Sequence, residues 1–292
     1  MKQKLYISFL WLLFLQYSFV HAQTRHALII AIAQYPEHSE WWDINADNDI
    51  AVLMPQIEKQ NFKTILLQNE QATKANIMKT FSIFTSQLKK GDIVYIHFSC
   101  HGQQMEDDDG DEPDGWDEAL IPYDAELSYE KGVYEGENHL RDDEFNKVLI
   151  EMREKLGAEG MTLVSLDACH SASATRDEND EEVLRGTPRR FCPSGRIYEQ
   201  THNANKHYTD TPLAQGENMA PLVVISACKS YQVNGEIKRE GKRYGPLSYF
   251  LAKAFEKESI LAVESWIPVI IKTMKKNTKQ TPVWEATIDL GL

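Results

Sequence analysis

Six short runs of apolar residues recur along the chain, separated by longer stretches in which apolar positions return at helical spacing. The runs are rich in Ile, Val and Leu and stay apolar at consecutive positions. This pattern is typical of strands buried on both faces of a mainly parallel sheet. The runs begin at His26, Phe62, Asp92, Met161, Pro221 and Thr281.

Four of the intervening segments predict amphipathic helices, because their apolar residues recur every three or four positions. Thr73 is a suitable N-cap for one of them, and Gly157 follows the apolar face that begins after Asp142. Alternating strands and helices without an internal repeat predict one α/β domain, with about six mainly parallel strands and helices on both faces. The four helical segments are 46–59, 74–90, 143–156 and 246–257.

The first 22 residues have the pattern of a secretory signal peptide. Lys2 and Lys4 precede an apolar run at 7–15, and small residues stand at Val20 and Ala22. We therefore expect residues 1–22 to be removed and a single domain at 23–292 to be secreted or periplasmic. A retained membrane anchor is the alternative; no later stretch reaches the length of a membrane-spanning helix.

The chain is acidic, with a formal net charge of -13, which becomes about -15 when Lys2 and Lys4 leave with the signal peptide. Such a charge disfavours nucleic acid and anionic membranes as partners. It suits cationic ligands, such as metal ions or basic peptides.

The four cysteines would allow two disulfides in an exported protein. Three of them lie at or near the ends of strand-like runs, and only Cys192 lies in a loop, so we expect at most one bridge. The cysteines are Cys100, Cys169, Cys192 and Cys228.

Two long segments, 102–141 and 170–220, do not fit the alternation of strands and helices, and each directly follows a predicted strand. Long loops in compact domains are usually functional or disordered. In open α/β sheets, ligands bind beyond the carboxyl ends of the strands. His101 and Cys169, which open these two segments, therefore lie where chemistry is expected.

Cys169 and His101 are the residue types of a cysteine nucleophile and its acid/base partner. The backbone N–H groups of Gly102 and Cys169 are candidate donors to an oxyanion. Taken alone, Cys169 would more commonly be a small buried hydrophobe, and His101 a structural histidine. Their shared position at strand ends, each opening a long segment, favours the catalytic interpretation. A zinc site built from the two Cys-His dipeptides is disfavoured, because adjacent residues on a strand point to opposite faces.

Four motifs appear in order: "YIHFSCHGQQ", "DGWDEALIPYD", "LVSLDACHSASATR" and "VVISACKSYQ". Together they resemble the caspase-like domain of metacaspases and their bacterial relatives, over essentially the whole mature chain. The resemblance implies a caspase-like three-layer sandwich and a cysteine peptidase with Cys169 as nucleophile and His101 as general acid/base. One departure is Ala172, where relatives usually have Gly.

The resemblance also implies the specificity. Metacaspase-like proteins cleave after Arg or Lys and line their first pocket with acids, which correspond here to Asp49 and Asp167. Ser99 matches a third pocket position. Read from the residues alone, Asp49 is also a carboxylate favoured at a helix N-terminus, and Asp167 a buried, hydrogen-bonded acid.

A dense acidic stretch at 106–118 holds nine carboxylates in thirteen residues. No register of it forms an EF-hand, and a solvated acidic loop is the alternative. The resemblance implies that the chemistry requires no cofactor but that calcium is a possible activator. Its ligands would be Asp117, Asp142, Asp143 and, one position out of register, Asp177; Asp142 also suits a helix cap.

Between Arg176 and Lys206 the chain carries four further arginines among polar residues, a composition typical of sites that proteases nick. An Arg-specific peptidase with this segment beside its own site would cut itself there, and we predict cleavage after Arg189 or Arg190. The alternative is that these arginines pair with the acidic stretch, each pair contributing little. The four are Arg185, Arg189, Arg190 and Arg196.

The leading prediction is a monomeric, exported endopeptidase that acts on basic peptides through a thioester on Cys169. An alternative prediction is an enzyme that forms the same thioester but transfers its acyl group to an amine. A third is a catalytically idle caspase-like domain that binds a basic partner through its acidic cleft.

Overall fold

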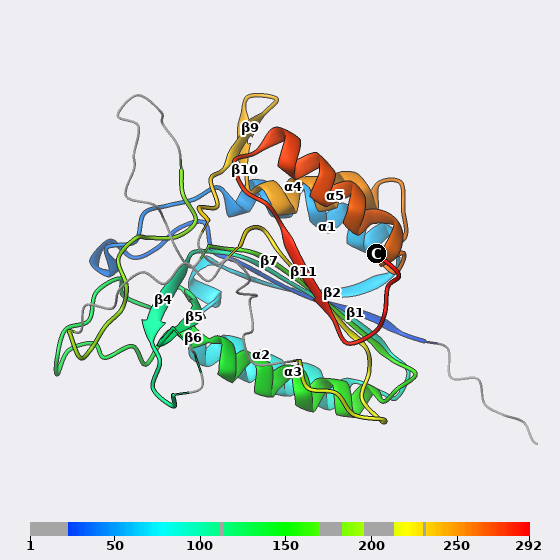
Figure 1. Ribbon diagram of the computed structural model, residues 1–292, viewed down its shortest axis with the longest axis horizontal. Coiled ribbons are helices and arrows are strands. Elements are labelled where there is room, and N and C mark those ends of the chain that lie inside the picture. The colour runs from blue at the N-terminus through cyan, green and yellow to red at the C-terminus, as the bar shows by residue number, and fades with distance from the viewer. Residues whose placement is uncertain (1–22, 111, 113, 170–182, 196–212, 230–231) are drawn as a thin grey trace, which may run out of the picture.

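The computed structural model describes residues 23–110, 112, 114–169, 183–195, 213–229 and 232–292 (Figure 1). The predicted signal peptide at 1–22, Asp177 and parts of the 176–206 segment lie outside the described residues. Within them no helix has the length and apolar character needed to cross a membrane.

A six-stranded sheet forms the centre of the domain, in the order β11-β8-β7-β3-β1-β2. Five strands are parallel, and β11 pairs antiparallel with β8. All six predicted strands are confirmed. They are β1 (Arg25–Ala31), β2 (Phe62–Gln68), β3 (Ile93–Ser99), β7 (Met161–Asp167), β8 (Leu222–Ser226) and β11 (Val283–Ala286).

Helices cover both faces of this sheet, which confirms the three-layer sandwich (Figure 1). In β1, Leu28 and Ile30 pack toward one helix layer, while Ala27 and Ile29 pack toward the other. Consecutive apolar residues therefore fill two separate cores. One layer contains α2 (Lys74–Gln87) and α3 (Asp142–Leu156); the other contains α1 (Ala46–Lys59), α4 (Pro246–Phe255) and α5 (Val263–Asn277), of which α5 was not predicted.

The register of β3 and β7 determines where the active-site residues meet. The two strands run parallel, and Ser99 pairs with Asp167 at their carboxyl ends. His101 and Cys169 each follow two residues later. Two motifs separated by more than sixty positions in the sequence are therefore neighbours at one edge of the sheet.

The prediction that 102–141 is a long loop is wrong in part, because the segment contains a three-stranded antiparallel sheet. The sequence conceals it because polar residues alternate irregularly with apolar ones at its buried positions: Gln103 is fully buried and hydrogen-bonds His139 and the Leu127 carbonyl. Its strands are β4 (Gly102–Glu106), β5 (Trp116–Leu120) and β6 (Leu140–Arg141). The remaining elements are a hairpin of β9 (Ile237–Arg239) and β10 (Lys242–Tyr244), and short 3-10 turns at Glu37–Ser39 and Asn69–Gln71.

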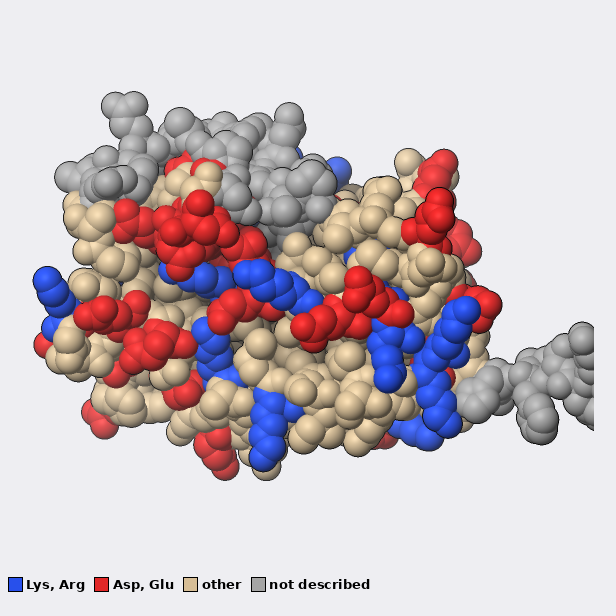
Figure 2. All heavy atoms as spheres, turned by 90° about the horizontal axis from the view of Figure 1, so that it is seen from below, with Lys and Arg blue, Asp and Glu red and all other residues tan. Residues whose placement is uncertain are grey.

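The outer face of the α2 and α3 layer carries acidic and basic side chains interspersed with one another (Figure 2). One such pair joins the two helices, with Lys74 Nζ 2.8 Å from Glu144 Oε2. Exposed pairs of this kind contribute little to stability. This face therefore shows no single-sign surface that would attract a polyanion.

Candidate active site

The two predicted oxyanion donors point to one atom. The backbone N–H of Cys169 donates to the carbonyl oxygen of Arg185 at 3.0 Å, and that of Gly102 donates to the same oxygen at 3.2 Å. Both Cys169 and His101 are fully buried at this point. The strand ends thus converge on a peptide carbonyl, as the chemistry of acyl transfer requires.

His101 is held in one tautomer. Its Nε2 lies 2.7 Å from the backbone oxygen of Trp42; a carbonyl can only accept, so Nε2 carries the proton. The ring stacks on Trp41 at 4.7 Å between centroids. Nδ1 has no hydrogen-bond partner among the described residues, so it is available as the base.

Burial keeps this imidazole neutral. Desolvation lowers the pKa of His101 to about 3; the hydrogen bond to Trp42 opposes this shift, and the nearby charge of Arg185 adds to it. A neutral imidazole with an accessible Nδ1 lone pair can accept a thiol proton.

The thiol of Cys169 donates a hydrogen bond to the backbone oxygen of Gln232, at 2.7 Å. The thiol of the predicted nucleophile therefore lies against a backbone carbonyl oxygen. The thiol of Cys228 is 3.6 Å from the same oxygen, and its hydrogen bond with Cys169, together with burial, holds the pKa of Cys228 well above its usual value. All four cysteines are free thiols, in agreement with the expectation of at most one disulfide.

Asp49, in the first turn of α1, lies in a buried acidic cluster beside these strand ends, called the acidic pocket below. Its Oδ2 accepts from Ser99 Oγ at 2.8 Å, and its Oδ1 accepts from the backbone N–H of Gly245 at 2.8 Å. The side chain is fully buried. Asp49 therefore makes tertiary contacts in addition to occupying the favourable helix N-terminal position that the sequence alone indicates.

Asp167 completes the predicted set of pocket residues at the end of β7. Its Oδ1 accepts from Asn234 Nδ2 at 2.8 Å, and its Oδ2 accepts from Ser248 Oγ at 2.6 Å. Gly245 approaches so closely that a Cβ there would meet Asp167 Oδ2 and the Arg185 guanidinium. The structure thus brings Asp49, Asp167 and Ser99 into one pocket.

The guanidinium of Arg185 fills this pocket. Its Nη1 is 2.7 Å from Asp49 Oδ2, 2.8 Å from Ser99 Oγ and 4.0 Å from Asp167 Oδ2. Its Nη2 is 2.9 Å from Glu236 Oε1. All four charged side chains of this cluster are fully buried.

Glu236 was not predicted from the sequence, and no motif or spacing marks it. It is oriented by Asn45, whose backbone N–H and side-chain Nδ2 donate to its two oxygens at 2.7 and 2.6 Å. The backbone oxygen of Trp42 was also missed, because a main-chain contact has no signature in a side-chain pattern. Both residues come to the site only through the tertiary fold.

The electrostatics of the pocket favour a cation. Burial raises the pKa of Asp49 to about 7; the charge of Arg185 opposes the rise, while that of Asp167 adds to it. The pKa of Arg185 is raised: burial lowers it, but Asp49, Asp167 and Glu236 together outweigh that effect. A pocket with three carboxylates and no cation would be strongly unfavourable.

The predicted self-cleavage residues Arg189 and Arg190 lie outside this pocket, and cleavage after them stays a prediction. Arg189 lies at the surface, with Nη1 3.1 Å from Glu40 Oε2. The guanidinium of Arg190 stacks over the ring of Trp116 at 4.4 Å. Arg185, a few residues earlier, lies in the pocket instead, and its carbonyl oxygen accepts from the N–H groups of Cys169 and Gly102.

The predicted metal ligands are distributed over two clusters. Asp142 lies with Glu112 and Glu118, and one ligand oxygen from each falls within 4.8 Å of the others. Asp117 instead pairs with Arg141. Asp143 is adjacent in the first turn of α3, its N–H donating to Asp142 Oδ1 at 3.1 Å. Glu112 and Glu118 lie in the acidic stretch but were not singled out.

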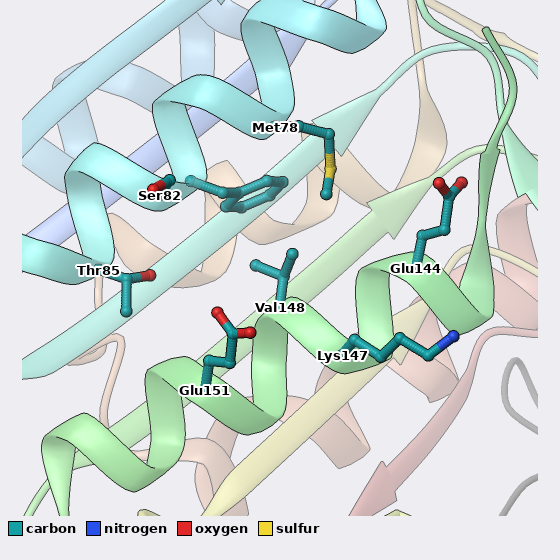
Figure 3. A pocket seen from close by; sticks show the side chains of 8 residues that line it. Met78, Ser82, Thr85, Glu144, Lys147, Val148 and Glu151 are labelled. Carbon is teal, nitrogen blue, oxygen red and sulfur yellow. The ribbon is translucent and has the colours of Figure 1, made fainter. Parts of the chain in front are cut away.

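A groove between α2 and α3 is separate from this site (Figure 3). Apolar Met78, Phe81 and Val148 line it together with charged Lys147 and Glu151. None of the active-site residues lines it. The acidic pocket is not an open cavity, because the guanidinium of Arg185 fills it. It is identified by its charged side chains instead.

Comparisons with known proteins agree with this geometry. Residues 24–290 match the family model described as "Caspase domain". The chain is similar to Metacaspase III c of Phaeodactylum tricornutum (32% identity over 160 residues, 51% of this chain and 43% of the relative). It is also similar to Metacaspase-1 of Eremothecium gossypii (39% identity over 103 residues, 35% of this chain and 20% of the relative). The chain thus spans less than half the length of these curated relatives.

Two solved structures share the fold. The crystal structure of protein GSU0716 from Geobacter sulfurreducens aligns with a TM-score of 0.59 and 22% identity, covering 91% of this chain and 95% of that one. Caspase-1 from Spodoptera frugiperda aligns with a TM-score of 0.52 and 13% identity, covering 92% and 90%. With a family match over nearly its whole length, this chain belongs to the caspase domain family of cysteine peptidases.

Proposed function

We propose that this protein is an exported cysteine endopeptidase that hydrolyses peptide bonds after Arg or Lys and processes itself within the 176–206 segment. The observation that carries the proposal is the seating of Arg185. Its guanidinium lies among Asp49, Asp167 and Glu236, while its carbonyl oxygen accepts from the two predicted oxyanion donors.

The chemistry follows from the positions of Cys169 and His101. Nδ1 of His101 would take the thiol proton, and Sγ would attack a carbonyl whose oxygen sits between the N–H groups of Cys169 and Gly102. The same imidazole would then protonate the leaving amine, and water would hydrolyse the thioester. Trp42 supports both steps by fixing the tautomer.

The acidic pocket would select the residue before the cleaved bond. A guanidinium can pair with two carboxylates at once, and an ammonium can occupy the same position as a point charge. An aspartyl side chain would bring a fourth carboxylate beside Asp49, Asp167 and Glu236. We therefore expect substrates to be basic peptides, in keeping with a net charge of -13.

We expect the purified protein to cleave fluorogenic peptides that end in Arg or Lys and to leave the matched Asp peptide intact. The difference in kcat/KM between Arg and Asp should exceed about a hundredfold, since a buried unpaired charge costs about 3–5 kcal/mol. Preferential cleavage after Asp would refute the pocket assignment while keeping the nucleophile. Folded protein that reacts with no peptide, nor with an arginyl electrophile, would support the idle binding domain instead.

Calcium is a second element of the proposal, as an activator rather than a participant in the chemistry. Oxygen ligands from Glu112, Glu118 and Asp142 suit this ion. Burial, followed by the charges of Asp117, Glu112 and Asp143, raises the pKa of Asp142 well above its usual value. A divalent cation would relieve this repulsion and tie the acidic stretch to the start of α3.

Calcium binding should appear as a rise in the unfolding temperature that the Glu118→Gln variant loses. At a hundredfold excess of calcium over its Kd the stabilisation is about 2.7 kcal/mol. Asp109→Asn is the matched control, because Asp109 is an exposed acid of the same stretch. If calcium raises the unfolding temperature of neither wild type nor control, the calcium proposal is wrong.

A further inference from the structure

The part of the chain that forms β9, β10, α4 and α5 is basic, although the chain as a whole is acidic. Residues 238–279 contain ten Lys and Arg against four Glu, a formal charge of +6, whereas the whole chain carries -13. The rest of the chain therefore carries -19. So uneven a distribution of charge is typical of a surface that meets a partner of the opposite sign.

The lysines of this part of the chain are available to a partner. Lys253 pairs with Glu256 at 2.7 Å, an exposed contact that contributes little to stability. Lys257, Lys272 and Lys275 are exposed as well, and they form no ion pair with any residue that the structure describes. A partner that brings carboxylates to them would displace water and no existing ion pair.

A groove of about 570 Å³ lies between α4 and α5, which pack side by side over one face of the sheet (Figure 1). The α5 residues that line it extend from Ser265 to Asn277. At 1.5 Å per residue this distance is about 18 Å along the helix axis. The groove therefore has the length of a helical peptide of about three turns.

Apolar side chains line the groove along this length. Trp266 and Ile270 of α5 are buried in it, while Val269 is 57% exposed. On the α4 side, Tyr249 and Phe250 are half-buried. A single exposed valine is ordinary, but here it adjoins aromatic side chains in one concave strip. Such a strip suits the apolar face of an amphipathic helix.

Cations outnumber carboxylates among the described residues that line this groove. Arg239, Lys253 and Lys257 contribute to it, and Glu258 is its one carboxylate. The Lys253 ammonium lies 5.8 Å from the centroid of the Tyr249 ring, so charge and aromatic surface adjoin. A ligand that fits here therefore combines apolar groups with negative charge.

The groove between α2 and α3 provides a comparison. It is also lined by apolar side chains, but its charged residues are Lys147, Glu144 and Glu151. A helix rich in carboxylates would be repelled by two like charges there and attracted by three cations between α4 and α5. The two grooves therefore differ in the sign of the partner that each favours.

We infer that the groove between α4 and α5 is a docking site for an acidic amphipathic helix of a partner protein. The helix lays its apolar face on Trp266, Val269 and Ile270 and carries Asp or Glu at its flanks, beside the basic residues of the groove. A small anion would fill only part of its length. An anionic membrane would need protruding apolar groups, whereas Trp266 and Ile270 are buried.

This docking site is separate from the candidate active site. None of the residues that line the groove belongs to the acidic pocket or to the pair Cys169 and His101. The inference therefore goes beyond the proposed function and does not depend on it.

The test uses a fluorescein-labelled peptide of about four helical turns, with Leu at positions i, i+3, i+4 and i+7 and Glu at the others. It contains no Arg or Lys, so the proposed peptidase would not cut it. We expect fluorescence anisotropy to show saturable binding to the purified protein, weakened at least about fivefold by high salt because salt screens exposed charges. A peptide of the same composition with its Leu positions scrambled should bind about tenfold more weakly, because it presents no apolar face.

Two variants locate the binding. Val269→Asp should weaken it about tenfold or more, because it puts a carboxylate into the apolar strip, and Lys257→Glu should weaken it about fivefold by reversing one charge. Both side chains are exposed, so the fold should be retained. Lys147→Glu, at an exposed lysine of the groove between α2 and α3, is the matched control and should bind as wild type does.

Each other outcome overturns the inference. Absence of saturable binding, or equal losses in Lys147→Glu and Lys257→Glu, would show that the groove is not the docking site. Protein that ignores the peptide but binds phosphatidylserine vesicles through Lys257 would assign this face to an anionic membrane instead. Cleavage of an arginyl peptide, measured on the same samples, should be equal in Val269→Asp and wild type, so that failure of docking and failure of the proposed function are told apart.

Discussion

The Cys169→Ala variant is expected to lose at least about a thousandfold in kcat/KM toward an arginyl peptide, because no other group can form the thioester. The fold should be retained, since the change removes only one sulfur atom from a buried position at the end of β7. The oxyanion donor of residue 169 is a backbone N–H and stays in place. The measurement is steady-state cleavage beside circular dichroism of both proteins.

Cys192→Ala is the matched control for this substitution. Its thiol donates to Glu106 Oε2 at 3.4 Å, away from the strand ends, and it also belongs to the segment that follows Arg185. Activity equal to wild type is expected for the control. If Cys169→Ala retained the activity, a different nucleophile would have to be sought.

The Asp49→Asn variant is expected to lose roughly a hundredfold or more in kcat/KM toward both arginyl and lysyl peptides. The carboxylate lies 2.7 Å from the Arg185 guanidinium, and both groups are fully buried. Removing one partner of a buried pair costs about 3–5 kcal/mol, because the remaining charge is left uncompensated. The amide is nearly isosteric, so the loss reports charge and not shape.

Asp47→Asn supplies the control on the same turn of α1. Asp47 is exposed, and its Oδ1 accepts from Gln68 Nε2 at 2.7 Å, outside the pocket. Its substitution should leave kcat/KM unchanged. Equal effects of the two substitutions would mean that Asp49 serves the folding of the helix and not the binding of a cation.

Much of the fold could be predicted because it depends on local patterns. Runs such as that of β3 are apolar at most positions and show no alternation, so they predict strands buried on both faces. Thr73 does cap α2, by accepting from Asn76 N–H at 3.3 Å. The three-stranded sheet of β4 to β6 could not be predicted in this way. Its buried positions include a polar network around Gln103 and His139, which interrupts the hydrophobic periodicity.

The candidate site residues likewise fall into two groups: those that a sequence motif marks, and those that only the tertiary structure brings to the site. His101, Cys169, Asp167 and Ser99 follow directly from motifs at the ends of two strands, because a strand end places its side chains without further information. Glu236 had no such signal. It reaches the guanidinium only because residues 234–236 pair with residues 183–185.

The sequence by itself predicted the six strands of the central sheet and four of the five α-helices described, because these depend on local periodicity. The nucleophile, its base and the acidic pocket were implied by short motifs and their resemblance to metacaspases, and they stay predictions for the variants above to test. The tertiary structure alone decided which arginine of the 176–206 segment enters the pocket. Arg185 and Arg189 have the same side chain and lie close together in the sequence. Only tertiary contacts of their segment bury the first cation and leave the second at the surface.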